Sequence, residues 1–427
     1  MKKVITHINY LDPVTKEPEK GHLVIEKGRI AGFTHEVPSE ADVTIDGEGS
    51  WVMPGFIDLH VHFREPGYEE KETLATGAAA AAAGGYTTVV CMPNTQPPLD
   101  NREILKDMMQ RTRDLPCQIL FMAAVTKGLQ GKEKVDFQDY RGTPVVGVTD
   151  DGLPVTNAAI MLEALRQGRE EGILVANHCE EPSLMFDRSV NQGPASAMYG
   201  LTGVPPLAEE LMVQRDLYLA KVTNCPVHLQ HISTAASVEM IRRAKGEGVP
   251  VTAEATPHHF SLTEYMVMTR GTMAKMSPPL RSEHDMKAVA QGLADGTLDC
   301  IATDHAPHTL SDKEKDLAAA ANGVVGLETS FAASLTHLVE GGYMKLPRLV
   351  ECLSTRPAEI LGLKNKGVLT PGADADLVLV DLRTRRPVSS SNFASKGRNS
   401  PFDRIALRGG IQMTLRQGEV VFTSALL

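Results

Sequence analysis

Two histidines separated by one residue, His60 and His62, end an apolar segment of the sequence. In a β-strand, side chains at positions i and i+2 point to the same face, so the two imidazoles can reach one common place. A neutral imidazole is a frequent ligand of Zn²⁺. A single H-x-H motif is weak evidence of a metal site, because its meaning depends on the structure around it.

Further candidate ligands end other apolar segments in the middle of the chain, namely Asp150 with Asp151, His178, His231 and Asp304. If the segments are strands of one parallel barrel, all these side chains meet at the same end of it. The set is larger than one tetrahedral zinc needs, and it predicts two metals with a bridging carboxylate and a hydroxide nucleophile. Separate core histidines bonded to backbone are the alternative, which the shared strand-end position disfavours.

Arg64 lies two residues beyond His62 and is expected on the same inward face. A guanidinium group matches a carboxylate with two parallel hydrogen bonds, so Arg64 predicts a substrate that carries an acid group. The alternative is an ordinary surface ion pair with Glu65 or Glu69.

The elements that must position these residues alternate along the chain. Eight short apolar segments, from VMPGFIDLH to DCIATD, are separated by stretches of helical character. Alternating strands and helices indicate a parallel sheet, and eight of them predict a (β/α)8 TIM barrel with its active site at the C-terminal strand ends. The segment ETLATGAAAAAAGG is expected to be one of the helices, ended by Gly84 and Gly85.

Both ends of the chain are rich in strand patterns. HLVIEKGRIAGF predicts a hairpin that turns at Lys27 and Gly28, and ADADLVLVDL and GEVVF predict strands near the other end. We therefore expect an α/β protein in which residues 53–365 form the barrel, while residues 1–52 and 366–427 form a small β-sandwich domain. The charged stretch after Asp304 predicts a mobile loop.

Composition excludes several classes of protein. The net charge of −10 argues against nucleic-acid binding, which needs a basic face. No apolar run is long enough for a transmembrane helix, and the N-terminal residues lack the apolar stretch of a signal peptide. The six scattered cysteines contain no CxxC pair and predict reduced thiols in a cytoplasmic protein.

The motif P-G-x-I-D-x-H-x-H, with the later histidines and T-D-H, resembles the amidohydrolase superfamily over nearly the whole chain. DLHVHFREPG, MPNT, TDDG, NHCE, QHIST and ATDHAPH together resemble the bacterial dihydroorotases of the longer, two-domain type. This resemblance implies a zinc enzyme of pyrimidine biosynthesis that reversibly cyclises N-carbamoyl-L-aspartate to L-dihydroorotate. It also implies two Zn²⁺ ions per subunit, a homodimer and possible association with aspartate transcarbamoylase.

The resemblance further implies a role for each residue of the site. It assigns the metals to His60, His62, Asp151, His178, His231 and Asp304, with Asp151 as the bridge and Asp304 also as the acid/base. It assigns substrate contacts to His62, Arg64, Asn94, Ser277, His308, Asn322 and Gly323. Relatives commonly have asparagine in place of Ser277, and many bridge their metals with a carboxylated lysine that has no counterpart here. From the residues alone, Asp150 remains an alternative bridge, because its neighbour would face the other side of a strand.

Two other functions compete with this interpretation. A related cyclic-amide hydrolase, such as an allantoinase or a dihydropyrimidinase, would act on an uncharged ring and leave Arg64 without a partner. A non-catalytic scaffold homologue would be expected to lose strand-end histidines, and this chain has all four.

Overall fold

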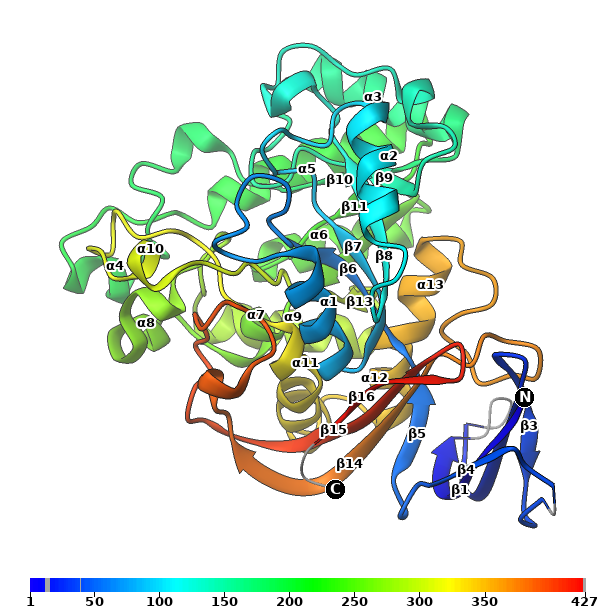
Figure 1. Ribbon diagram of the computed structural model, residues 1–427. Helices are drawn as coiled ribbons and strands as arrows, with labels where there is room; N and C mark the ends of the chain where they lie inside the picture. Colours follow the sequence, from blue (N-terminus) through cyan, green and yellow to red (C-terminus); the bar gives the residue numbers. More distant parts are fainter. Residues whose placement is uncertain (12–15, 39, 425–427) are drawn as a thin grey trace.

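The structure is a computed structural model that describes residues 1–11, 16–38 and 40–424 (Figure 1). A sheet of eight parallel strands forms its centre, with neighbours in chain order paired along it. The strands are β6 (Phe56–Val61), β7 (Tyr86–Cys91), β8 (Gln118–Ala123), β9 (Val145–Val148), β10 (Leu174–Asn177), β11 (Val227–Leu229), β12 (Val251–Ala255) and β13 (Cys300–Ile301). Beyond β13, His305 bridges to Val61 of β6, which returns the last strand to the first. The predicted (β/α)8 barrel is confirmed.

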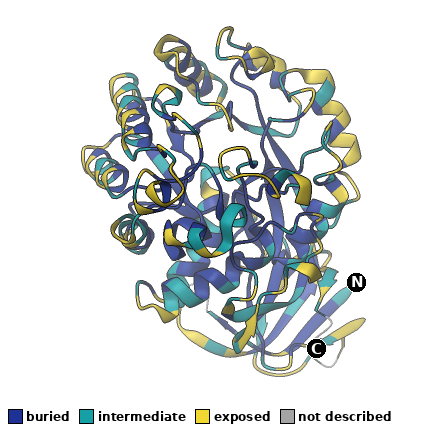
Figure 2. Ribbon diagram, turned by 90° about the vertical axis from the view of Figure 1, so that its left-hand side faces the viewer, coloured by how far each residue is buried: buried dark blue, intermediate teal, exposed yellow. Residues whose placement is uncertain are grey.

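Helices surround the barrel, and their outward faces are exposed while the strands are buried (Figure 2). The longer helices are α1 (Leu74–Ala83), α2 (Arg102–Arg111), α3 (Ala158–Glu171), α5 (Leu207–Thr223), α6 (Ala235–Gly246), α9 (Glu283–Asp295) and α11 (Leu327–Ser334). The short ones are α4 (Pro194–Met198), α7 (Pro257–Ser261), α8 (Tyr265–Arg270), α10 (Leu310–Lys313), α12 (Leu346–Val350) and α13 (Arg356–Ile360). None of the described helices is both long and apolar enough to cross a membrane.

Helix α1 shows how sequence sets an element of the barrel. Thr73 and Thr76 form a capping box at its start, which satisfies backbone N–H groups of the first turn. Its alanines form a buried face of small side chains. A Cβ on Gly77 would lie only 2.5 Å from the ring of Phe63. Gly84 caps the helix and Gly85 follows with a φ of 86°, which favours glycine. The predicted helix is confirmed.

The chain ends combine in a second sheet, in the order β16-β15-β14-β5-β1-β2-β3, with β4 paired to β1. Its strands are β1 (Lys2–Leu11), β2 (Pro18–Glu26), β3 (Arg29–Thr34), β4 (Val43–Asp46), β5 (Trp51–Pro54), β14 (Leu377–Pro387), β15 (Ala406–Arg416) and β16 (Glu419–Thr423). The hairpin predicted at Lys27 and Gly28 joins β2 to β3. The predicted β domain from both chain ends is confirmed, and hydrogen bonds connect all its strands in one sheet.

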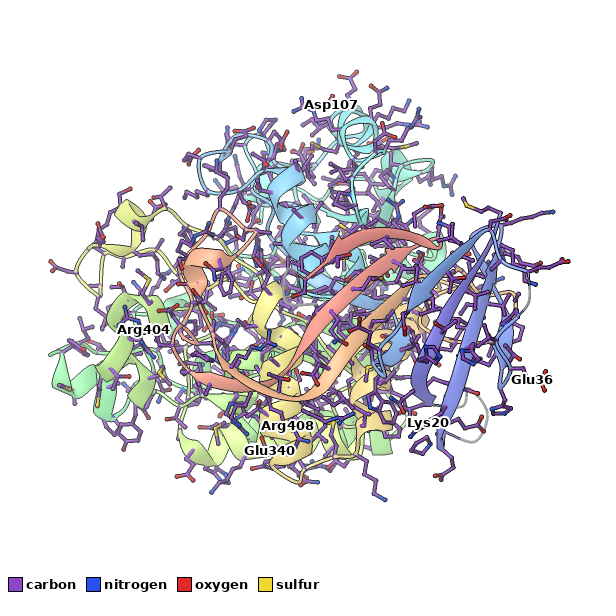
Figure 3. The ribbon with its side chains drawn as sticks, turned by 60° about the horizontal axis from the view of Figure 1, so that its bottom comes forward. Lys20, Glu36, Asp107, Glu340, Arg404 and Arg408 are labelled. Atoms are coloured by element: carbon purple, nitrogen blue, oxygen red, sulfur yellow. The ribbon has the colours of Figure 1, made fainter. Side chains whose placement is uncertain are left out.

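In Figure 3 this second sheet spans the molecule from Lys20 and Glu36 on one side to Arg408 on β15. There, Nη1 of Arg408 lies 3.8 Å from the carboxylate of Glu340, which ends the helical segment after α11. Contacts of β15 with α11 hold the sheet against the barrel helices. The β domain is therefore packed on the barrel and not merely linked to it.

The sequence segment VMPGFIDLH, predicted as one strand, is two strands of different sheets. β5 ends at Pro54 and β6 begins at Phe56, so only Gly55 separates them. A Cβ on Gly55 would lie 2.4 Å from Oγ1 of Thr87, and its N–H donates to the carbonyl of Asp376 at 2.8 Å. Glycine is required here because the chain passes this closely between the sheets. The domain limits at 52/53 and 365/366 stay predictions.

Candidate metal centre and substrate cavity

A cavity of about 230 Å³ opens at the C-terminal ends of the barrel strands. Its lining includes His62, Arg64, Asn94, Asp151, His178, His231, Ser277, Asp304, His308, Asn322 and Gly323. The structure thus brings every residue that the resemblance assigned to the site to one place, apart from His60. His60 is fully buried and contacts the same cluster from below the cavity surface.

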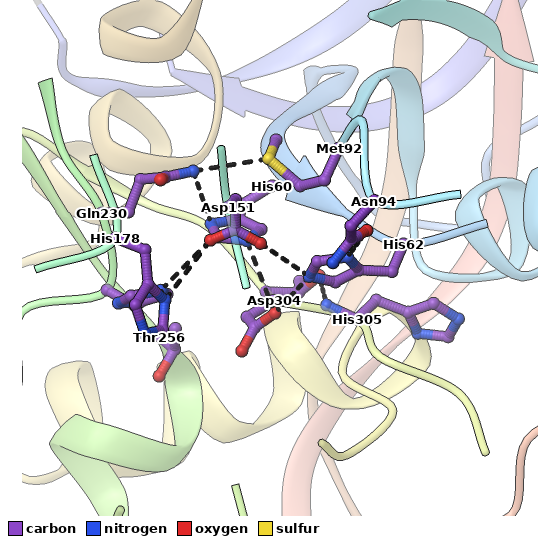
Figure 4. Close-up of polar contacts among 12 residues, drawn as sticks. His60, His62, Met92, Asn94, Asp151, His178, Gln230, Thr256, Asp304 and His305 are labelled. Carbon is purple, nitrogen blue, oxygen red and sulfur yellow. Dashed lines mark hydrogen bonds and ion pairs between the residues drawn. The ribbon is translucent and has the colours of Figure 1, made fainter. Parts of the chain in front are cut away.

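One carboxylate oxygen of Asp151 faces the first pair of histidines (Figure 4). Oδ2 lies 3.3 Å from Nε2 of His60 and 3.4 Å from Nε2 of His62. Oδ1 of Asp304 approaches the same two nitrogens, at 3.5 Å and 2.9 Å respectively. Two imidazoles and two carboxylates therefore converge on one point.

The other oxygen of Asp151 faces the second pair of histidines. Oδ1 lies 3.5 Å from Nδ1 of His178 and 3.6 Å from Nε2 of His231, and these two nitrogens are 2.8 Å apart. Asp151 thus stands between two groups of nitrogen ligands, one on each oxygen. This is the arrangement that a bridging carboxylate requires.

Asp150 points away from the cluster and is used inside the barrel wall. Its Oδ1 accepts hydrogen bonds from the backbone N–H groups of Val125 at 2.8 Å and Thr126 at 3.0 Å, and Oδ2 accepts from the Thr126 hydroxyl. The two carboxylates therefore point to different sides of the chain just beyond β9. Of the two alternatives, only Asp151 reaches the histidines.

The cluster fits a cation on grounds of both geometry and charge. His60, His62 and Asp151 form one group, and Asp151, His178 and His231 form another, whose candidate ligand atoms lie within 4.8 Å of one another. Nε2 of His60 and Oδ1 of Asp151 are buried and have no hydrogen-bond partner, although buried polar atoms normally have one. These two atoms are oriented as metal ligands would be.

Electrostatics at the cluster favour positive charge. Burial raises the pKa of the Asp304 carboxyl, but the hydrogen bond from His62 and the nearby imidazoles outweigh it and hold that pKa below its usual value. Burial likewise lowers the pKa of His178, yet the carboxylates of Asp151 and Glu180 raise it overall to about 10. The carboxylates therefore stabilise positive charge at the cluster.

Buried carboxylates behind the histidines hold the rings in place. Glu254 Oε1 lies 2.7 Å from Nδ1 of His60, and its Oε2 lies 3.1 Å from Nε2 of His228. Glu180 Oε2 lies 2.9 Å from Nε2 of His178. Such partners fix the tautomer and orientation of a ligating imidazole. The motif-based prediction missed both glutamates. Glu180 lies within the NHCE motif, and Glu254 lies at a position of its strand whose side chain points into the barrel.

Arg64 takes the position that a substrate-binding cation needs. Nε donates to the carbonyl of Pro307 at 3.2 Å, and Nη2 lies 3.3 Å from Nε2 of His308. The alternative ion pairs do not form: Glu65 pairs with Arg111, and Glu69 accepts from the N–H of Gly67. Among the ion pairs of the described residues, none includes Arg64, so its guanidinium remains available to an anion in the cavity.

Asn94 and Ser277 line the cavity but also contact other residues of the site. Asn94 Oδ1 lies 2.9 Å from Nδ1 of His62, which orients that ring. The Ser277 hydroxyl donates to Glu180 Oε2 and so joins the support of His178. Serine at this position therefore has a structural partner in addition to any contact with substrate.

The segment after Asp304 is tied down by hydrogen bonds from distant parts of the chain. Lys313, which is fully buried, donates from Nζ to the carbonyls of Lys275, Ala321 and Gly323 at 2.8 to 3.1 Å. Nε2 of His308 lies 2.7 Å from the carbonyl of Asn322, which joins the two sides of the segment. Its predicted mobility stays a prediction.

Asn399, from the C-terminal part of the chain, holds both ends of this segment. Its Nδ2 donates to the carbonyls of Ala306 and Gly323, each at 3.0 Å, and its Oδ1 accepts from the N–H of His308 at 3.2 Å. The backbone carbonyl of Asn399 also accepts from the N–H of Val325 at 3.0 Å. No pattern in the sequence pointed to this residue.

Comparisons with known proteins place this geometry in a family. The profile of the amidohydrolase family matches residues 51–421. The chain is 43% identical to the dihydroorotase of Syntrophus aciditrophicus over 425 residues, which cover 99% of both chains. It is 42% identical to the dihydroorotase of Pelotomaculum thermopropionicum over the whole of both chains. The chain belongs to the dihydroorotases of the amidohydrolase family.

Solved structures similar to this dihydroorotase family member share its whole architecture. The L-hydantoinase (dihydropyrimidinase) of Arthrobacter aurescens superposes with a TM-score of 0.88 at 27% identity, covering 98% of this chain and 95% of that one. The dihydropyrimidinase of Brevibacillus agri superposes with a TM-score of 0.86 at 22% identity and supports the fold alone. The combination of barrel and β domain is thus common to these hydrolases.

Proposed function

We propose that this protein is a zinc-dependent dihydroorotase, which reversibly cyclises N-carbamoyl-L-aspartate to L-dihydroorotate. The observation that carries the proposal is the half-buried guanidinium of Arg64, free of ion pairs, on the same cavity as the histidine–aspartate cluster. The substrates on both sides of this reaction carry a carboxylate, which the guanidinium can bind with two hydrogen bonds. Identity of 43% to a dihydroorotase over nearly the full length supports the same assignment.

Two Zn²⁺ ions would be held by the ligand groups that share Asp151. His60, His62 and Asp304 complete the first group, and His178 and His231 complete the second. Nitrogen and carboxylate oxygen are the donors that catalytic zinc prefers. When bound, the metals supply Lewis acidity and make a hydroxide available near neutral pH.

The remaining chemistry belongs to side chains of the chain itself. Arg64 and Asn94 bind and orient the substrate carboxylate, and His308 with the backbone of Gly323 borders it on the loop side. Asp304 moves the proton: in ring opening it accepts a proton from the nucleophile and passes it to the ring nitrogen that leaves. In ring closure the same carboxyl must begin protonated, so acidic pH favours cyclisation.

The proposal also covers the compartment, the pathway and the assembly of the enzyme. It places the reaction in cytoplasmic pyrimidine biosynthesis, in a homodimer that can associate with aspartate transcarbamoylase. The described cysteines are all free and buried, which suits a reducing compartment.

The test is to purify the protein without chelator, measure its zinc content, and compare turnover of L-dihydroorotate, dihydrouracil and allantoin. We expect about two zinc ions per chain and a clear preference for dihydroorotate. A preference for an uncharged ring would instead support a dihydropyrimidinase or allantoinase, in line with the fold shared with hydantoinases. Absence of both zinc and turnover would support a scaffold.

A further inference from the structure

The backbone at Asp304 takes a conformation that few residues adopt. Its φ is 46°, in the left-handed region that residues other than glycine rarely enter, although aspartate enters it more easily than most. Such residues cluster at functional sites, where their surroundings hold them. Arg64 and His231, which line the same cavity, also have positive φ angles, of 61° and 33°. The direction of the Asp304 carboxylate therefore depends on the residues that fix this turn of the chain.

Asp58 holds the chain on the N-terminal side of Asp304. Its Oδ1 accepts from the N–H of Thr303 at 3.0 Å, and its Oδ2 accepts from the hydroxyl of Thr303 at 2.6 Å. The same Oδ1 also accepts from the N–H of His60 at 3.0 Å. Asp58 is fully buried and so ties the chain just beyond β13 to β6.

The backbone of His305 holds the chain on the C-terminal side of Asp304. Its carbonyl accepts from the N–H of His62 at 2.9 Å, and its own N–H donates to the hydroxyl of Thr303 at 3.2 Å. Asp304 thus stands between two residues that are each bonded to other parts of the barrel. In Figure 4 the His305 ring points away from the metal cluster, whereas the Asp304 carboxylate points towards it.

The ring of His305 is fixed as well as its backbone. The N–H of Gly326 donates to Nδ1 at 3.2 Å, and since a backbone N–H can only donate, Nδ1 carries no proton. The ring proton is therefore on Nε2, which lies 3.5 Å from Oε2 of Glu72. Phe63 meets the ring edge-on, with the two centroids 6.3 Å apart. His305 and Glu72 are both buried, so water does not compete for these contacts.

Glu72 is itself anchored by the C-terminal part of the chain. Its Oε2 accepts from the hydroxyl of Ser395, and its Oε1 accepts from the N–H of Lys396 at 3.2 Å. A chain of contacts thus runs from Ser395 through Glu72 and His305 to the turn at Asp304. None of the first three residues is among those that line the cavity, so they act on the site only through Asp304.

We propose that His305, held by Glu72, is a positioning residue for the proton transfer, because it fixes the turn that carries the Asp304 carboxylate to the reacting atoms. The inference rests on the role of Asp304 in the proposed function. Misplacing a catalytic group by about 1 Å costs about 10²-fold in rate. If His305 only packed the barrel interior, its loss would lower stability without a specific effect on kcat.

Two substitutions of His305 separate its contacts. His305→Asn keeps an acceptor where Nδ1 stands but has no donor that reaches Glu72, whereas His305→Gln keeps a donor near the position of Nε2. We expect kcat for dihydroorotate to fall about 100-fold in His305→Asn and about tenfold in His305→Gln, with KM and zinc content close to those of the native protein. His284→Gln, at an exposed position of α9, is the matched control. An unchanged kcat in His305→Asn, or a fall that follows loss of zinc, would overturn the proposal.

Ser395→Ala tests the far end of the same chain of contacts without altering the barrel interior. It should lower kcat about threefold at unchanged KM, because Glu72 loses one of its hydrogen bonds. Ser391→Ala, at an exposed position of the same segment, is the control. Equal kcat in the two variants would show that Ser395 does not act on Asp304.

Crystal structures of the native protein and of His305→Asn test the positioning without reference to the reaction. In the variant, the Asp304 carboxylate should move away from Nε2 of His62, from which it lies 2.9 Å in the native chain. An unmoved Asp304 would overturn the inference. A native protein that does not turn over dihydroorotate would instead refute the proposed function, and the displacement of Asp304 would still decide whether His305 positions it.

Discussion

His60 lies on barrel strand β6 and His62 directly follows it, whereas His308 and Gly323 reach the same cavity from a loop that Asn399 and Lys313 hold. The metal side is thus positioned by strand periodicity, a local property of the sequence. The loop of the substrate side is positioned by hydrogen bonds from Asn399, which lies 76 to 93 residues further along the chain. The two sides should therefore fail separately when they are mutated, one losing metal and the other losing substrate affinity.

The largest effect is expected at the residue that serves both sides. Asp304→Asn keeps the shape of the side chain but cannot take up the proton, so turnover should fall about 10²- to 10⁴-fold. Steady-state kinetics and zinc analysis of the same preparation measure both properties. Retained turnover would remove Asp304 from the acid/base role.

Arg64→Met should raise KM for dihydroorotate about 100-fold, because a charge-assisted contact with the carboxylate contributes up to about 3 kcal/mol. Zinc content should stay unchanged, since Arg64 is bonded to Pro307 and His308 and not to the metal cluster. An unaltered KM would show that the carboxylate binds elsewhere.

Glu254→Gln should weaken zinc binding about tenfold, because the amide orients His60 less well than the carboxylate does. Competition with a chelator measures the affinity, and Glu239→Gln on the exposed face of α6 is the control. KM measured with saturating zinc should not change. A raised KM with unaltered zinc affinity would contradict the division between the two sides.

Asn399→Ala should raise KM about fivefold with zinc affinity intact, because its loss leaves carbonyls at both ends of the loop without their donor, at about 1 kcal/mol. Asn392→Ala, at an exposed position of the same segment, is the control.

A double variant of Asn399 and His308 sharpens this test. If Asn399 acts by holding His308, the two alanine substitutions should be less than additive in KM. Full additivity would mean that Asn399 supports only the general stability of the fold.

The difference between the metal side, set by strand positions, and the substrate side, set by distant hydrogen bonds, also explains what could be predicted from the sequence. The barrel and the convergence of His178, His231 and Asp151 followed from strand-end positions, because parallel strands bring these ends together. Asp151 could not be separated from Asp150 by pattern, since the choice depends on Thr126 binding one of them. Asn399 was missed because its partners lie far away in the sequence. β15 was missed too, and with Gly409 and Gly410 near its centre it lacks a strand pattern.

The single-residue passage at Gly55 has a mechanical consequence. Two lobes that move as rigid bodies need a linker of several residues to absorb rotation, and here one crowded glycine joins β5 directly to β6. The β domain and the barrel must therefore move as one rigid body. Entry of substrate and release of product then do not depend on rotation of the β domain against the barrel.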